Sequence, residues 1–196
     1  ENGPKKLKIS KKKFVYLISP NKIKRSFYKD LDEILKLKKV SFFQLRLKGA
    51  SFKKKIFIGK KIKKICKKNK TKFLINDDVL LARYLNSDGC HLGQKDMKIL
   101  KARKILKKKI IGITCHNSLA LAKLATKNKA DYLAFWAFYH SKTKKTKFKA
   151  NLSLLKKITK ITKTPIVAIG GINSKKKKKL LLNKANFLAI SGYIWN

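Results

Sequence analysis

Acidic residues are scarce in this 196-residue chain, which holds 9 Asp and Glu against 53 Lys and Arg, a formal charge of +44. Such an excess normally suggests nucleic acid or an acidic surface as a partner. Arginine is scarce too, although the recognition of phosphates and bases favours its bidentate guanidinium. The lysines are spread over every helical segment, and lysine, isoleucine and asparagine are all abundant, as AT-rich coding would produce. We therefore predict no specific nucleic-acid partner.

Cysteines are few, and long apolar runs are missing. Cys66, Cys90 and Cys115 are widely spaced and form no CxxC pair, which indicates a reducing setting. No apolar run approaches the ~20 residues that span a bilayer. The first ten residues lack the apolar core of a signal peptide. We expect a cytoplasmic protein without a membrane partner, in which Cys90 and Cys115 are packing residues.

What the chain does contain is a regular alternation of short apolar runs and lysine-rich segments. The apolar runs are rich in β-branched and aromatic residues, which is typical of strands. We predict strands at 14–19, 42–47, 72–76, 89–93, 109–115, 132–138, 165–171 and 187–193. The segments between them have helical periodicity, at 30–38, 52–67, 79–84, 97–106, 118–127, 152–158 and 174–182. Asn117 or Ser118, Asn151 and Ser174 are the expected N-caps.

This alternation predicts an α/β fold of parallel βαβ units, and eight strands are the number that closes a TIM barrel. We predict a single (β/α)8 domain over residues 14–196, preceded by a basic segment at 1–13. A doubly wound open sheet is the alternative. The eighth helix is expected to be short or missing, because few residues follow the last predicted strand.

In a (β/α)8 barrel the chemistry lies at the carboxyl ends of the strands. Polar or glycine-rich residues follow nearly every predicted strand in this chain. Gln44, Arg46 and Lys48 are spaced by two, so they share one face of a strand. A guanidinium beside an ammonium suits a polyanion such as diphosphate. Asp77 and Asp96 follow the next two strands, and hard carboxylate oxygens suit Mg²⁺ together with substrate phosphates.

A second group of residues can hold phosphate. The string SKTKK at 141–145 offers hydroxyls and lysines, and the glycines of IGGI at 169–172 let backbone N–H groups approach an anion. Two anionic groups in one mouth suggest that the chain joins two phosphorylated small molecules. His91, Asp78 and Asp88 are interpreted as structural, with Asp77 as a mere helix cap left open as an alternative. His116 is a candidate for orienting a substrate.

Several motifs resemble the thiamine phosphate synthase family in order and spacing, over about residues 14–195. They are QLRLK, INDD, SDGCHLGQKDM, IIGITCHN, ADYLAFWAFYHSKTKK, VAIGGIN and NFLAISGYIW. The resemblance implies transfer of hydroxymethylpyrimidine from its diphosphate to a thiazole phosphate, with release of diphosphate. It also implies a dissociative mechanism, in which the bond to diphosphate breaks before the thiazole nitrogen attacks.

The same resemblance implies roles for individual residues. Mg²⁺ would be held by Asp77 and Asp96. The pyrimidine diphosphate would be held by Gln44, Arg46, Lys48, Asn76, Thr114 and Lys144, of which Arg46, Lys48 and Lys144 would act in catalysis. The thiazole phosphate would be held by Ser141, Lys142, Thr143, Gly171, Ile190 and Ser191.

Three positions depart from the family's pattern. Asp78 stands where a basic residue is usual, Trp136 lies within the segment that usually reads GxGP, and His140 replaces a proline. Two alternatives therefore stay open: a thiazole tautomerase-like paralogue, and a non-catalytic barrel that binds a thiamine precursor. An assembly of identical chains is compatible with either.

Overall fold

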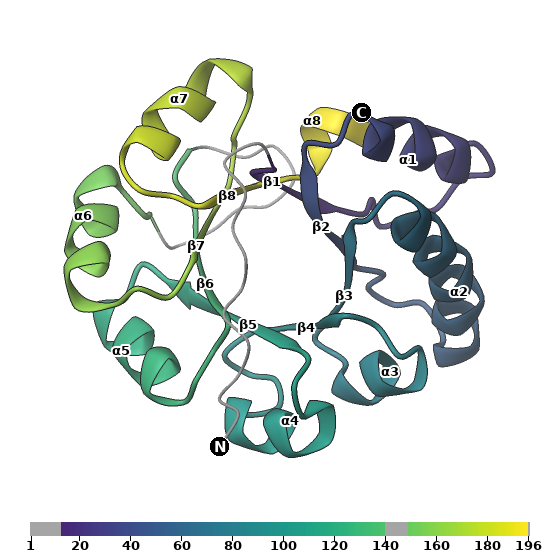
Figure 1. Cartoon of the computed structure of the whole chain (residues 1–196), viewed down its shortest axis with the longest axis horizontal. Helices are drawn as coiled ribbons and strands as arrows, with labels where there is room; N and C mark the ends of the chain where they lie inside the picture. The colour runs from purple at the N-terminus through teal and green to yellow at the C-terminus, as the bar shows by residue number, and fades with distance from the viewer. Residues whose placement is uncertain (1–12, 140–148, 196) are drawn as a thin grey trace.

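A computed structural model of the chain describes residues 13–139 and 149–195. Eight parallel strands form a closed barrel in sequential order, ringed by helices (Figure 1). The strands are β1 Val15–Ile18, β2 Val40–Leu45, β3 Lys72–Asn76, β4 Gly89–Leu92, β5 Ile110–His116, β6 Tyr132–Phe135, β7 Ile166–Ile169 and β8 Phe187–Ile190. The predicted barrel is confirmed, and the open sheet is excluded because β1 pairs with β8.

The helices follow the strands as predicted. They are α1 Phe27–Lys36, α2 Phe52–Lys68, α3 Val79–Tyr84, α4 Ile99–Leu106, α5 Leu119–Lys127, α6 Leu152–Ile161, α7 Ser174–Leu182 and α8 Gly192–Trp195. The eighth helix is short, as expected. Its Trp195 packs against Phe27 of α1 with ring centroids 5.0 Å apart, and its indole N–H donates to the carbonyl of Ile18, 2.7 Å away. α8 thus covers the seam between β8 and β1.

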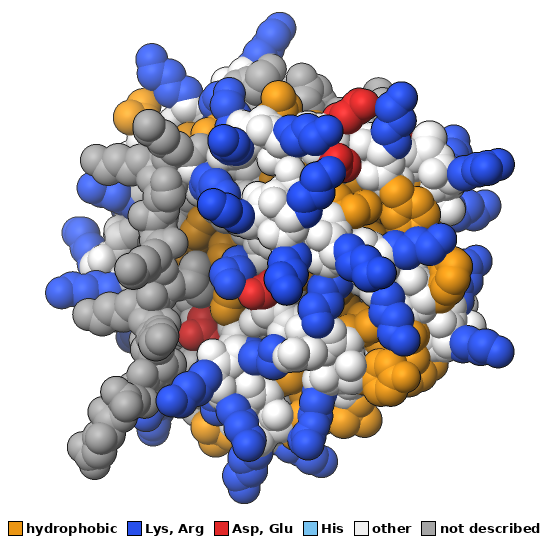
Figure 2. Space-filling model, turned by 45° about the vertical axis from the view of Figure 1, so that its right-hand side comes forward, with side chains coloured by type: hydrophobic (Ala, Val, Ile, Leu, Met, Phe, Trp, Pro, Cys, Tyr) orange, Lys and Arg blue, Asp and Glu red, His pale blue; other side chains and the backbone are white. Residues whose placement is uncertain are grey.

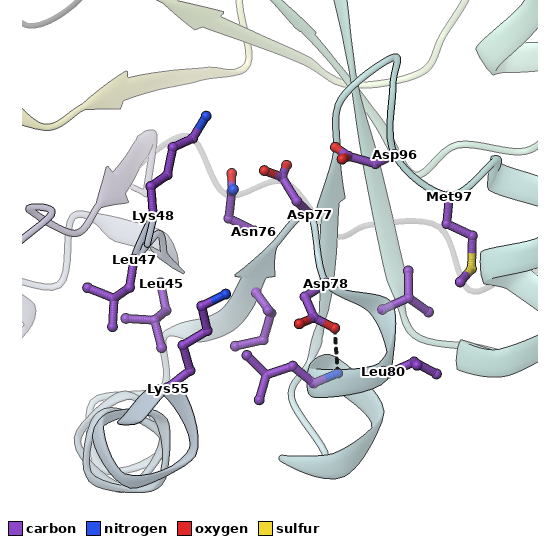
Figure 3. A pocket seen from close by; sticks show the side chains of 13 residues that line it. Leu45, Leu47, Lys48, Lys55, Asn76, Asp77, Asp78, Leu80, Asp96 and Met97 are labelled. Atoms are coloured by element: carbon purple, nitrogen blue, oxygen red, sulfur yellow. Dashed lines mark hydrogen bonds between the residues drawn. The ribbon is translucent and has the colours of Figure 1, made fainter. Parts of the chain in front are cut away.

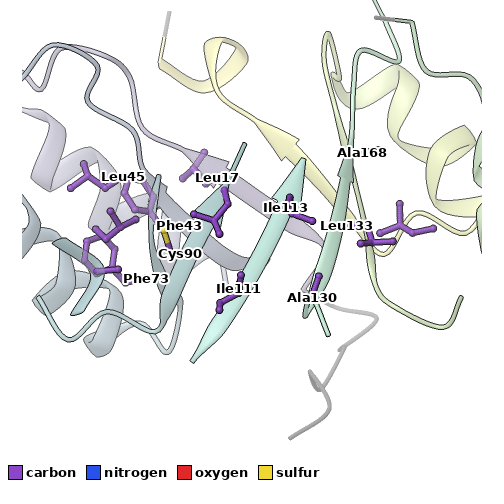
Figure 4. Packing of buried hydrophobic residues seen from close by; sticks show 14 of the residues in the cluster. Leu17, Phe43, Leu45, Phe73, Cys90, Ile111, Ile113, Ala130, Leu133 and Ala168 are labelled. Carbon is purple, nitrogen blue, oxygen red and sulfur yellow. The ribbon is translucent and has the colours of Figure 1, made fainter. Parts of the chain in front are cut away.

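Alternation along each strand separates two apolar cores. The larger lies between strands and helices and includes Phe43, Cys90 and Leu133 (Figure 4). The smaller fills the barrel and includes Tyr16, Phe42 and Phe187. Cys66, Cys90 and Cys115 are all buried and free, so the interpretation of the last two as packing residues is confirmed. Two-residue periodicity therefore determines which polar side chains emerge inside the mouth.

Several helices start at a side-chain cap, although α1 and α4 do not. Ser118 and Asn151 accept from the backbone N–H three residues on, as predicted, at 3.2 and 2.9 Å. The cap of α7 is Asn173, at 3.2 Å, and not the predicted Ser174, which is the first helical residue. Asp78 caps α3 by accepting from Leu81, at 2.9 Å. Its acidic side chain therefore has a structural role at a helix N-terminus.

Helix ends show the effect of the lysine bias. Positive φ values follow six helices, where glycine is the usual residue. Here lysine takes five of those positions and asparagine one: Lys38, Lys70, Asn86, Lys107, Lys129 and Lys184. Only two other non-glycine residues in the described ranges have positive φ, Asp77 at 65° and His116 at 53°. Both lie at the opposite end of the barrel, where β3 and β5 finish.

Ion pairs lie at the end of the barrel where the strands begin. Arg103 and Asp131 pair at 2.6 Å, and Lys72 and Asp88 at 2.8 Å. Asp32 pairs with Lys36 and Lys68, each the last residue of its helix. Asp88 also accepts the N–H of Phe73, and Asp131 that of Ile111, so both carboxylates hold strand starts in place. The interpretation of Asp88 as structural is confirmed.

The remaining basic side chains are dispersed. Figure 2 shows them over the whole displayed face, with apolar side chains between them and few acidic ones. Within residues 13–139 and 149–195, no helix is both long and apolar enough to cross a bilayer.

Candidate active site

Inward-facing positions lead up each strand to the rim. On β2 the series runs from Phe42, in the apolar filling of the barrel, to buried Gln44 and then to Arg46 and Lys48 beyond the strand end. Asn76 ends β3, Thr114 and His116 lie at the end of β5, and Ser191 follows β8. The predicted site residues within the described ranges therefore lie at one end of the barrel, as parallel strands require.

Two carboxylates meet at the ends of β3 and β4. Asp77 has a left-handed backbone (φ 65°), a conformation that Asp tolerates better than most residues, and its N–H donates to the carbonyl of His91 at 2.7 Å. Asp96 returns toward the strand end from the following loop, where one carboxylate oxygen accepts the N–H of Gly93 at 2.7 Å. Hydrogen bonds to the backbone thus hold the main chain of Asp77 and the side chain of Asp96 in place.

Asp96 adds to the effect of burial on Asp77. The pKa of Asp77 is raised to about 6, first by burial and then by the hydrogen bond and negative charge of Asp96. Lys48 and Asn76 oppose this effect without cancelling it. A partly buried pair of acids that shares a site favours either a proton or a cation between them.

A cavity of about 460 Å³ opens beside this pair. In Figure 3 the side chains of Lys48, Asn76, Asp77 and Asp96 lie around one edge of it, and Lys55 reaches in from α2. Lys55 was not predicted as a site residue. Its position in the first turn of a helix that follows the Lys48 loop is the signal that could have found it.

The donor set fits a hard divalent cation. Mg²⁺ characteristically takes one or two protein carboxylates and completes its shell with water and phosphate oxygens. The described ranges contain no group of three or more His, Cys, Asp or Glu side chains arranged for a metal. Asp77 and Asp96 are the two carboxylates that would hold such a cation, and Lys48 lies close enough to affect the charge of Asp77.

The other predicted diphosphate ligands on these strands have definite partners. Gln44 is buried and donates its amide N–H to the hydroxyl of Tyr16 at 2.7 Å. Arg46 is held by its backbone, which donates to Ser19 Oγ at 2.9 Å, while its guanidinium donates to Asn21 at 3.4 Å. The remaining guanidinium donors suit an anionic ligand.

The side of the rim formed by β6–β8 is glycine-rich. Gly170 and Gly171 both have positive φ, of 105° and 58°, and a Cβ on Gly170 would lie 2.7 Å from that of Ala137. Glycine is therefore required for the tight approach of β6 and β7. Ile190 ends β8 and Ser191 follows it. Ser141, Lys142, Thr143 and Lys144 lie outside the described residues, as does His140.

His116 and Trp136 form a pair between the ends of β5 and β6. The indole N–H of Trp136 donates to Nδ1 of His116 at 2.9 Å, with ring centroids 5.8 Å apart. This bond leaves the imidazole proton of a neutral His116 on Nε2. Trp136, at a small position of the family pattern, is thus held at the rim by a hydrogen bond to a residue of the preceding strand.

Sequence reasoning missed two tyrosines inside the barrel, Tyr16 and Tyr132. They hydrogen-bond to each other at 2.8 Å, and Tyr132 also contacts His91 at 2.9 Å. The interpretation of His91 as a structural residue agrees with its burial, but its partners connect it to the predicted ligand Thr114. The inward positions of the two tyrosines on β1 and β6 were the available signal.

Comparisons with known proteins identify the family of the chain. A family model described as thiamine monophosphate synthase matches residues 15–194. A thiamine-phosphate synthase of Pelagibacter ubique is 69% identical over 94% of this chain and 90% of its own length. One from Erythrobacter litoralis is 37% identical over 93% of this chain and 88% of its own.

A solved structure of thiamine phosphate pyrophosphorylase from Pyrococcus furiosus superimposes with a TM-score of 0.81. It is 29% identical and covers 92% of this chain and 86% of its own. The family resemblance seen in the motifs is therefore confirmed over almost the whole barrel. The chain belongs to the thiamine monophosphate synthase family and is a transferase of thiamine biosynthesis.

Proposed function

We propose that the chain transfers hydroxymethylpyrimidine from its diphosphate to a thiazole phosphate, with Mg²⁺ held by Asp77 and Asp96. The observation that carries the proposal is the pair of carboxylates beside Lys48 at the end of the barrel where chemistry takes place. Together with the phosphate oxygens of the substrate, the pair supplies the shell that Mg²⁺ prefers.

The remaining predicted residues are assigned to two subsites. Gln44, Arg46, Asn76, Thr114 and Lys144 join Lys48 in holding the pyrimidine diphosphate. The thiazole phosphate is assigned to Ser141, Lys142, Thr143, Gly171, Ile190 and Ser191. The family membership and the glycine geometry at Gly170 and Gly171 support this division.

In this proposal the protein's main task is to stabilise a leaving group. Negative charge grows on diphosphate as the carbon–oxygen bond breaks, and preorganised cations lower the energy of that state. The guanidinium of Arg46 and the ammonium groups of Lys48 and Lys144 supply such charge. The bound metal would act as a Lewis acid on the phosphate oxygens. The thiazole nitrogen would then capture the pyrimidine carbocation.

The test is an assay of the purified protein with both substrates and Mg²⁺, monitored for thiamine phosphate and diphosphate. We expect turnover that excess chelator stops. Asp96→Ala should reduce kcat/KM at least about 100-fold, on the scale of losing one transition-state contact. The matched control is Asp88→Ala, which removes an acid from the same stretch but at the other end of the barrel. Full activity of Asp96→Ala would refute the metal assignment.

The same assay separates the alternatives. A tautomerase-like paralogue would act on a thiazole phosphate but release no diphosphate, and a non-catalytic barrel would bind a precursor without turnover. The 69% identity to a thiamine-phosphate synthase favours the transfer reaction. A cytoplasmic location is part of the proposal, and it is supported by three buried, unpaired cysteines.

A further inference from the structure

Five polar side chains from five strands form one chain of hydrogen bonds across the inside of the barrel. Their order is Gln44 (β2), Tyr16 (β1), Tyr132 (β6), His91 (β4) and Thr114 (β5), linked by distances of 2.7, 2.8, 2.9 and 2.9 Å. All five are at most 9% exposed. Buried polar groups of this kind must satisfy one another, because unpaired ones are costly.

The position of Tyr132 depends on a glycine of β5. A Cβ built on Gly112 would lie 1.8 Å from the phenol ring, so no other residue leaves room for it there. The ring stacks on the imidazole of His91, with centroids 5.7 Å apart and planes 14° apart. The space that Gly112 leaves therefore brings the hydroxyl of Tyr132 within hydrogen-bond distance of both Tyr16 and Nδ1 of His91.

The donor and acceptor roles along the chain follow from its first link. The amide nitrogen of Gln44 can only donate, so the oxygen of Tyr16 accepts and its own proton goes to Tyr132. Tyr132 then donates to Nδ1 of His91. A neutral imidazole that accepts at Nδ1 carries its proton on Nε2, which donates to Thr114 Oγ1.

Both phenols keep their protons, as this order requires, because burial raises the pKa of each of them. No phenolate therefore interrupts the sequence of donors near neutral pH.

We propose that this hydrogen-bond chain turns the Thr114 hydroxyl into a dedicated donor toward the mouth of the barrel, where it binds an oxygen of the diphosphate substrate. Thr114 accepts from His91, so its own proton is directed away from the chain. Ionised phosphate oxygens accept hydrogen bonds, so a fixed donor suits them. Tyr16, Tyr132 and His91 are positioning residues in this inference, which rests on the proposed function for the identity of the ligand.

The first test reads the position of the imidazole proton in the ligand-free protein. Nitrogen-15 NMR of labelled protein distinguishes a protonated ring nitrogen from an unprotonated one. We expect the His91 proton on Nε2 at pH 7. A proton on Nδ1 would overturn the proposal, because Tyr132 would then accept and Thr114 would donate inward to Nε2. This outcome does not depend on whether the protein turns over.

The second test is a double-mutant cycle on Tyr132→Phe and Thr114→Val, both of which keep the shape of the side chain. It measures the affinity for inorganic diphosphate with Mg²⁺ and the KM for the pyrimidine diphosphate. Thr114→Val should lower the affinity for diphosphate by about tenfold or more, because it loses a hydrogen bond to a charged group. Tyr132→Phe should weaken binding about threefold, because the Thr114 proton is no longer held in one direction.

The decisive comparison is the double variant. If Tyr132 acts through Thr114, adding Tyr132→Phe to Thr114→Val should change affinity by less than about twofold. The control is Tyr28→Phe, which removes a phenol hydroxyl on α1 outside the barrel and should leave binding unchanged. If the double variant instead loses affinity by the product of the two single losses, the proposal is overturned. Failure of the wild-type protein to bind diphosphate at all would instead refute the proposed function, and the proton position would still test the chain.

Discussion

Where the strands begin, Asp88 and Asp131 each pair with a basic side chain, whereas where they end, Asp77 and Asp96 lie against each other. All four ion pairs of the described residues involve acids at the end where the strands begin, and these acids are Asp32, Asp88 and Asp131. The pKa of Asp32 is lowered to about 2 by its hydrogen bonds to Asn69 and Lys68, while that of Asp77 is raised to about 6.

The few acids of this chain therefore fall into two groups. Those where the strands begin contribute to stability, and those where the strands end are the ones that we assign to function. Carboxylates at the beginning of the strands are already neutralised and hold backbone N–H groups. Those at the other end are kept close together without a neutralising ion pair in the described ranges, which costs stability. An arrangement that costs stability persists where a ligand repays it, and a cation at this pair of acids, as we propose, would repay it.

The largest expected effect on stability is at the beginning of the strands. Asp131→Ala should lower the free energy of unfolding by about 3 kcal/mol, because it leaves the partly buried guanidinium of Arg103 without its counter-ion. Chemical denaturation measures this loss, and kcat of the folded fraction should be unchanged. Asp30→Ala, at an exposed acid of the first turn of α1, is the control and should cost less than 1 kcal/mol, about that of a helix-terminus charge. A large loss of kcat in Asp131→Ala would contradict the assignment of Asp131 to stability alone.

Low pH should destabilise the protein through His91, which is buried inside the barrel. The pKa of His91 is lowered from 6.5 to about 4 by burial, so between these values the unfolded chain binds a proton that the folded one does not. Stability due to His91 is therefore complete above pH 6.5 and is lost as pH falls toward 4, by up to about 3 kcal/mol. Asp77 acts in the opposite direction, because its raised pKa favours the folded state below about pH 6.

The Asp96→Asn background removes the part of that opposing effect that is due to Asp96. In it, the free energy of unfolding should fall between pH 7 and pH 4.5, as measured by denaturant titration. Adding His91→Gln should remove this part of the pH dependence. An unchanged slope would show that His91 is not held neutral.

At the other end, removing one acid should stabilise the protein. Asp96→Asn keeps an oxygen that can accept from Gly93 but relieves Asp77 of a neighbouring charge. Because Asp77 is only half buried, we expect a gain of about 1 kcal/mol at pH 7 without metal, after allowance for solvent screening. The gain should disappear at pH 5, and Mg²⁺ should stabilise the wild type more than the variant. A loss of stability at pH 7 would contradict the repulsive pair.

The smallest expected effect concerns a helix end. Lys184 follows α7 with φ 72°, so Lys184→Gly should stabilise the protein by about 0.5 to 1 kcal/mol. The matched control is Lys178→Gly inside the same helix, which should destabilise by a similar amount. Thermal unfolding of the two variants checks the opposite signs, and equal signs would exclude backbone strain at Lys184.

Much of the fold followed from the sequence because strands and helices alternate with clear periods. The ranges predicted for β3, α3 and α7 agree with the structure residue by residue. The strand at 132–138 was predicted too long, because Trp136 and Ala137 are apolar yet lie beyond the end of β6 at the rim. The strand at 42–47 was placed two residues late, since polar Ser41 hid the start of β2.

Residues of the candidate site could be predicted where a rare residue type marks them. They could not be predicted where a contact between strands defines them. Asp77 and Asp96 stood out because acids are rare in this chain. The pairing of Trp136 with His116 depends on a contact between neighbouring strands that no local pattern encodes. The direction of the hydrogen bonds from Gln44 to Thr114 depends on five strands and on the space left by Gly112.

The dispersed lysines have a consequence for the order in which ligands arrive. A surface of such high positive charge creates a field that draws in polyanions and repels free divalent cations before either reaches the barrel. Free Mg²⁺ would approach slowly, whereas a complex of Mg²⁺ with a diphosphate still carries net negative charge. We expect the metal to enter together with its substrate, at a rate that falls as ionic strength rises. Asp77 and Asp96 would then bind a metal ion that, as a free cation, the positive surface repels.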